Sequence, residues 1–155
     1  MKTGKLIGLV LCLGLAGANA FADDGGGFET TIVGSTPGEH VAGIASAGAP
    51  WKVAKGQSTI ANSGRINVEI KGLLLSAGDS INTVGPVTMV MASVACGDVV
   101  AASTAPVLLT STGNAAIHDS IILPSSCVAP AVLIRIAATT TGPVANGPFI
   151  AINAL

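Results

Sequence analysis

RINVEIKGLLL, residues 65–75, is the stretch that decides the fold of this chain. Polar and apolar side chains alternate along its first seven residues, with Ile66, Val68 and Ile70 on one face. Successive side chains of a β-strand point to opposite faces of a sheet, so strict alternation indicates one buried and one solvated face. The stretch therefore predicts a half-buried antiparallel strand.

The residues on either side extend this strand into a sheet. The turn Asn62-Ser63-Gly64 precedes it and WKVAKGQSTIA (51–61) precedes the turn, so these segments together indicate a β-hairpin. The run VTMVMASVA (87–95) is apolar on both faces, which predicts a central strand with both faces covered. Further short strands are expected at 99–104, 107–110, 115–123, 131–140 and 148–155.

About seven or eight short strands separated by turns are typical of an all-β domain. The turns recur every 8 to 14 residues or so, and no segment of useful length has a helical period. This spacing favours an antiparallel sandwich of the immunoglobulin-like or fibronectin-like kind. We expect such a β-sandwich domain over residues 49–155.

The first 22 residues have the features of a secretory signal peptide. Lys2 and Lys5 form a basic start, a short apolar run follows, and the small residues of ANAFA provide a cleavage site. Cleavage fits after Ala20 or after Ala22, and we favour Ala22. A lipoprotein signal with Cys12 as the lipidated residue is the alternative.

The segment 23–48 is predicted to be a flexible mature N-terminus, because Gly, Ser, Thr, Ala and acidic residues dominate it. A short edge strand around 41–44 is one alternative within it. Once the signal is removed, five basic residues face eight acidic ones, which gives a net charge of −3. With no basic cluster and no long apolar run, we expect neither nucleic-acid binding nor a transmembrane segment in the mature chain.

Two cysteines, Cys96 and Cys127, remain after the signal is removed. An even pair in an exported protein is most simply a disulfide, so we predict that these two residues are bonded. A reactive thiol with His118 as its base is one alternative. A metal site that adds His118 and Asp119 is another, although the spacing matches no familiar metal motif.

The remaining candidates are His118, Asp119 and Trp51. Side chains of adjacent strand residues point to opposite faces, so His118 and Asp119 are expected on a solvated strand face and not in one site. Trp51 is interpreted as a core residue, with an exposed stacking platform for a ligand as the alternative. The sequence has no nucleophile elbow, P-loop, H-E-x-x-H or EF-hand motif, so we predict no catalytic, cofactor or metal-binding residue.

Three stretches together carry a resemblance to other proteins: the Pro50-Trp51 start, the hairpin strand GRINVEIKGL (64–73) and LPSSCVAP (123–130). Over residues 49 to about 137 the chain resembles a loosely defined group of exported bacterial proteins of unknown function. The resemblance implies an exported protein with one small β domain. It brings no activity, ligand or site residue with it.

Three functions remain open at this point. The first is a non-enzymatic binding or structural module, secreted or periplasmic, with an unknown extracytoplasmic partner and no cofactor. The second is a self-assembling surface or fibre subunit, favoured by low charge and by apolar outer positions such as Ile122 and Ile152. The third is a small extracytoplasmic hydrolase in which dispersed acids or His118 converge.

Overall fold

The computed structural model describes residues 27–127 and 129–154, and this part of the chain contains strands and no helix. The predicted signal peptide, residues 1–22, lies outside the described residues. The strands are β1 (Gly27–Gly34), β2 (His40–Val41), β3 (Ile44–Ala45), β4 (Trp51–Lys52), β5 (Lys55–Ala61), β6 (Arg65–Lys71), β7 (Leu74–Leu75), β8 (Val87–Cys96), β9 (Val99–Ser103), β10 (Val107–Leu108), β11 (Ala115–Ser120), β12 (Ala131–Thr139), β13 (Gly142–Pro143) and β14 (Phe149–Asn153). The predicted all-β class is confirmed.

Ten of these strands form one curled, antiparallel sheet. Its main path runs β10-β8-β12-β14-β1-β5-β6-β11, while β9 pairs with β8 and β13 pairs with β12. Two small pairs, β2 with β3 and β4 with β7, lie outside this sheet. The hairpin predicted from 65–75 is the β5–β6 pair, although Trp51 and Lys52 form a separate strand that pairs with β7.

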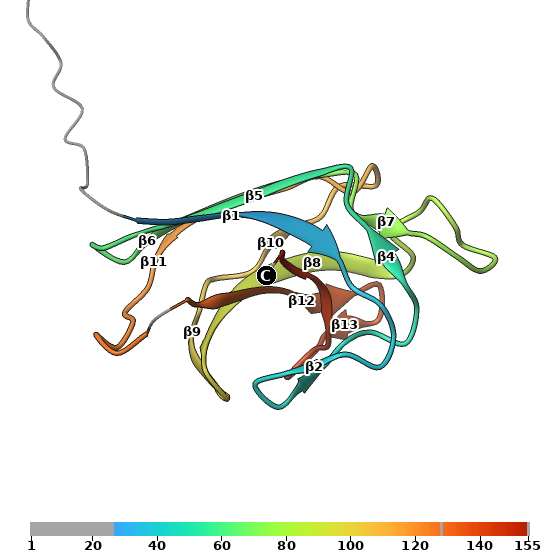
Figure 1. Ribbon diagram of the computed structural model, residues 1–155. Coiled ribbons are helices and arrows are strands. Elements are labelled where there is room, and N and C mark those ends of the chain that lie inside the picture. Colours follow the sequence, from blue (N-terminus) through green and yellow to red (C-terminus); the bar gives the residue numbers. More distant parts are fainter. Residues whose placement is uncertain (1–26, 128, 155) are drawn as a thin grey trace, which may run out of the picture.

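β1 joins the two layers into which the sheet folds. Its residues 27–31 pair with β5, and its residues 32–34 pair with β14. The layer of β5, β6 and β11 therefore lies over the layer of β8 and β12, as Figure 1 shows. At the far edges, the backbone N–H of Ala105 donates a hydrogen bond of 2.8 Å to the Asp119 carboxylate, which brings β11 close to the segment that follows β9.

The core lies between the two layers. The alternation of β6 places Ile66, Val68 and Ile70 in it, and β8 and β12 contribute Val90 and Ile134 from the opposite layer. All five side chains are almost fully buried, which is the main stabilising contribution in a fold that has no helix in its described part.

The predicted flexibility of 23–48 is wrong for its described part. Residues 27–34 form β1, which lies inside the sheet and buries Ile32 in the core, and β2 and β3 form a hairpin over 40–45. The strand could not be predicted from composition, because β1 buries only one side chain. Backbone hydrogen bonds to β5 and β14 hold it in place.

The immunoglobulin-like strand order is not confirmed. In that order the second strand lies beside the fifth within its sheet. Here β5 lies beside β6, the next strand of the sheet along the chain, and the last strand β14 pairs antiparallel with the first. This fold has the all-β class and the antiparallel pairing in common with immunoglobulin-like domains.

Candidate functional site

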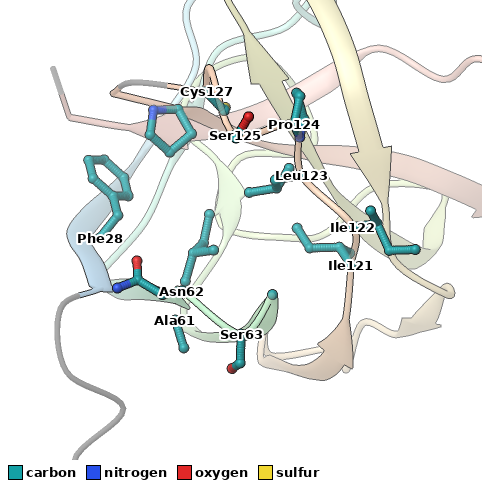
Figure 2. A pocket seen from close by; sticks show the side chains of 13 residues that line it. Phe28, Ala61, Asn62, Ser63, Ile121, Ile122, Leu123, Pro124, Ser125 and Cys127 are labelled. Carbon is teal, nitrogen blue, oxygen red and sulfur yellow. The ribbon is translucent and has the colours of Figure 1, made fainter.

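A pocket of about 360 Å³ opens at one end of the two layers, beside the predicted disulfide. Figure 2 shows its side chains, which come from three places: the start of β1, residues 60–64 at the end of β5 and in the turn to β6, and residues 121–127 and 130 after β11. We call it the disulfide-end pocket. Phe28 and Leu123 lie on two sides of it, and Cys127 lies at its edge.

Hydrogen bonds of Gly64 hold one wall of this pocket against the other. Gly64 has a φ of +85°, a conformation that glycine adopts without strain, and its N–H donates to the carbonyl of Ala61 at 2.8 Å. The N–H of Ile121 donates to the Gly64 carbonyl, also at 2.8 Å. The predicted turn at 62–64 therefore also positions the segment after β11.

The two cysteines predicted to pair lie at disulfide distance. Their Cα atoms are 5.1 Å apart, within the range that a disulfide spans. Cys96 is the last residue of β8, and Cys127 follows a turn in which its N–H donates to the carbonyl of Pro124 at 3.0 Å. This link fastens the wall formed by residues 121–127 to the opposite layer.

The lining of the disulfide-end pocket combines apolar and polar surface in about equal parts. Ile60 and Ile121 form its buried part, whereas Ile122 is 91% exposed, the highest value among the large apolar side chains described. The hydroxyl of Ser125 and the amide of Asn62 add polar groups at the lining. Such a surface offers apolar contacts with a few hydrogen bonds, which suits binding.

β11 ends at Ser120, three residues before the end of the strand predicted at 115–123. Ile122 was expected as an apolar outer position on that strand. It lies instead in the irregular segment that follows, beside the pocket. Ile152, the other apolar outer position considered, is partly buried in β14.

Trp51 lies in the core and offers no exposed platform. The residue is 6% exposed, and its backbone N–H donates to the Ser35 carbonyl at 2.9 Å. The indole Nε1 is buried without a hydrogen-bond partner. This burial favours the interpretation of Trp51 as a core residue over that of a stacking platform for a ligand.

His118 and Asp119 do not share a site. His118 is exposed, with Nδ1 at 3.0 Å from the Asn67 side-chain oxygen and Nε2 at 3.2 Å from a Glu69 carboxylate oxygen, both on β6. Asp119 accepts hydrogen bonds of 2.8 Å from the backbone N–H groups of Ala105 and Ser120. These two bonds, the one from Ala105 above all, lower the pKa of Asp119.

Neither His118 nor Asp119 approaches the cysteines in any bond that the structure shows, and Cys96 and Cys127 are engaged with each other. Within residues 27–127 and 129–154, no cluster of three or more His, Cys, Asp or Glu side chains is arranged to hold a metal ion. The described part of the chain also contains no helix that is long and apolar enough to cross a membrane.

Two residues that lie at hollows of the surface, Phe28 and Arg135, were not predicted as site residues. Phe28 lies in a stretch interpreted as flexible, and nothing local marks it as a pocket residue. Arg135 is the one charge within AVLIRIAATT (131–140), and a lone charge in an apolar strand was a signal that could have identified it.

Comparisons with protein-family models, with curated proteins and with solved structures found no match to this chain.

Proposed function

We propose that this protein is an exported, non-enzymatic binding module that holds an apolar segment of an extracytoplasmic partner in the disulfide-end pocket. The observation that carries the proposal is the pocket itself, with Ile122 exposed beside a buried apolar floor. Exposed apolar side chains that surround a hollow are typical of contact sites.

Two observations support the extracytoplasmic location. The first 22 residues have the pattern of a secretory signal. Cys96 and Cys127 lie at disulfide distance, which fits an oxidising compartment. We therefore assign the mature protein to the periplasm or the extracellular medium.

The chemistry of the pocket favours binding over catalysis. Its walls are aliphatic and aromatic, its polar groups are hydroxyls and an amide, and its sulfur atom belongs to the bonded Cys127. These groups can orient a ligand by hydrogen bonds and apolar contact. A hydrolase built on His118 would have to work from the exposed outer face of β11, where Glu69 and Asn67 surround the ring.

A peptide selection tests the proposal. A random peptide library displayed on phage is selected against the purified mature protein, and enriched peptides are titrated by fluorescence anisotropy. We expect enrichment of peptides with aliphatic or aromatic residues, and affinity about tenfold weaker for Ile122→Asp. Ile81→Asp is the matched control, because Ile81 is also an exposed isoleucine but lies in the loop before β8. Peptides that bind Ile122→Asp as tightly as the wild type would overturn the proposal.

A second candidate function is self-assembly through β9. In the described part of the chain, β9 pairs with β8 alone, so its other edge can accept a strand. Val99, on this strand, is 63% exposed, and the sequence VVAAS carries no charge or proline to block edge pairing. Such an edge favours pairing with a second copy of the chain.

Light scattering at increasing protein concentration tests this second function. Assembly through β9 predicts a mass that rises with concentration in the wild type and in Val33→Lys, and a monomer for Val99→Lys. Val33 is the matched control, because it is an exposed valine on a strand inside the sheet. A wild type that stays monomeric at every concentration would exclude assembly.

A further inference from the structure

A second hollow, of about 620 Å³, lies between β9, β12, the β2–β3 hairpin and the loop before β14. Its lining includes Ile44 of the hairpin, Val100 and Ser103 of β9, Arg135 of β12 and Pro148. Figure 1 shows β9 and β2 both below β12, with β9 toward the left and β2 at the bottom of the picture. We call this hollow the Arg135 groove.

Arg135 is the only charged residue among the buried polar residues of the described chain, with 8% of its surface exposed. Its Nε donates to the backbone carbonyl of Gly147 at 2.8 Å, and its Nη1 lies 3.4 Å from the hydroxyl oxygen of Ser93. Burial lowers the pKa of the guanidinium, yet an arginine side chain stays protonated in proteins. The groove therefore has a positive charge in its lining.

This charge has no counter-ion among the described residues. Both of its hydrogen-bond acceptors, the Gly147 carbonyl and the Ser93 hydroxyl, are neutral. The side chain of Arg135 lines the groove, and its bonds to described residues are made by Nε and Nη1. A buried charge without a partner is costly, and an anion at this place would relieve that cost.

The neighbours of Arg135 complete a site for one small anionic group. The Ser93 and Ser103 hydroxyl oxygens are 2.7 Å apart, so Ser103 connects to Arg135 through Ser93. The fork of a guanidinium matches the two oxygens of a carboxylate. One positive charge balances one carboxylate, whereas a phosphate monoester carries nearly two negative charges.

The walls of the Arg135 groove are suited to an apolar body attached to this anionic group. Ile44, Val100 and Pro148 contribute aliphatic surface from three separate elements. A volume of about 620 Å³ lies in the range of ligand-binding sites. The charge and the apolar walls together define a ligand with one acidic end and an aliphatic body.

We propose that the Arg135 groove binds a carboxylate that carries an aliphatic body, with the carboxylate placed against the guanidinium of Arg135. A free organic acid and the C-terminus of a peptide share this chemistry. The proposal is independent of the disulfide-end pocket, because the two hollows share no lining residue.

Isothermal titration of the mature protein with octanoate tests the proposal, and octanol and octyl phosphate are the comparison ligands. We expect saturable octanoate binding and affinity about tenfold weaker for octanol, which lacks the charge. No saturable octanoate binding, or tighter binding of octyl phosphate than of octanoate, would overturn the proposal for a free acid. The same titration tests whether the carboxylate belongs to a peptide. It compares the affinity of a peptide that ends in Ala-Val-Leu with a free carboxylate and the affinity of the same peptide with a C-terminal amide.

Two variants locate the binding. Arg135→Gln removes the charge, and Ile44→Asp places a negative charge on the apolar wall while leaving Arg135 in place. Both are expected to weaken octanoate binding about tenfold or more, and Ile122→Asp is expected to leave it unchanged. The Ile44 variant keeps the test valid if Arg135→Gln does not fold. Equal octanoate affinity in the wild type and Ile44→Asp would contradict the proposal.

Discussion

Cys96 and Cys127 lie 31 residues apart in the sequence, and their Cα atoms are 5.1 Å apart in the structure. Cys96 ends β8 in one layer of the fold, whereas Cys127 belongs to the irregular segment after β11. The pair thus joins the wall of the disulfide-end pocket to a central strand. Residues 121–127 belong to no strand, and the covalent link fastens them to the end of β8.

Removal of the disulfide is expected to destabilise the fold. Closing a loop of 31 residues lowers the entropy of the unfolded chain, which corresponds to about 3 to 4 kcal/mol of stability. Urea unfolding of the oxidised wild type and of the Cys96→Ser, Cys127→Ser double variant measures the difference. Reductant should destabilise the wild type and leave the double variant unchanged. Equal free energies of unfolding for both proteins would contradict the expectation.

Gly64→Ala is expected to destabilise the protein more than the same change at Gly38. Both glycines have a positive φ, so alanine costs about 1 to 2 kcal/mol at either position. At Gly64 a Cβ would also overlap the backbone of Ile121, whereas the space around Gly38 is open. The steric term adds about 1 to 3 kcal/mol. Urea unfolding of the two variants checks this order, and equal losses would show that the contact with Ile121 is not tight.

The fluorescence of Trp51 reports on its burial, because the chain contains no other tryptophan and no tyrosine. The ring lies in the core, so emission of the folded protein should be blue-shifted and weakly quenched by iodide. Unfolding in urea should shift the emission to the red and expose the ring to quenching. A Trp51→Phe, Ile81→Trp variant supplies the exposed reference. Equal quenching of the wild type and this variant would place Trp51 at the surface.

The alternation of polar and apolar residues was enough to predict the strands that contribute one full face to the core. In β6, for example, three consecutive inward positions, Ile66, Val68 and Ile70, are buried, and each reinforces the same period. β1 buries Ile32 alone and is held by its hydrogen bonds to β5 and β14. These partners are distant in the sequence, so no local pattern marks the strand.

The candidate sites were less predictable for a related reason. The cysteine pair could be identified by counting, because only two cysteines remain after the signal. The disulfide-end pocket brings together Phe28, Asn62 and Leu123, which are far apart along the chain. Their meeting depends on how β1 crosses between the layers. Arg135 was visible as a lone charge, but its burial without a counter-ion is a property of the folded structure.

Acid is expected to weaken the fold in part through Asp119. Backbone hydrogen bonds from Ala105 and Ser120 lower the pKa of its carboxyl in the folded state, so this group contributes stability above its unfolded pKa of about 4. The contribution is lost as the pH falls through that value toward the lower folded pKa. Urea unfolding from about pH 6 to about pH 3 should show Asp119→Asn losing less stability than the wild type. Identical curves for wild type and Asp119→Asn would show that the bond to Ala105 does not stabilise the fold.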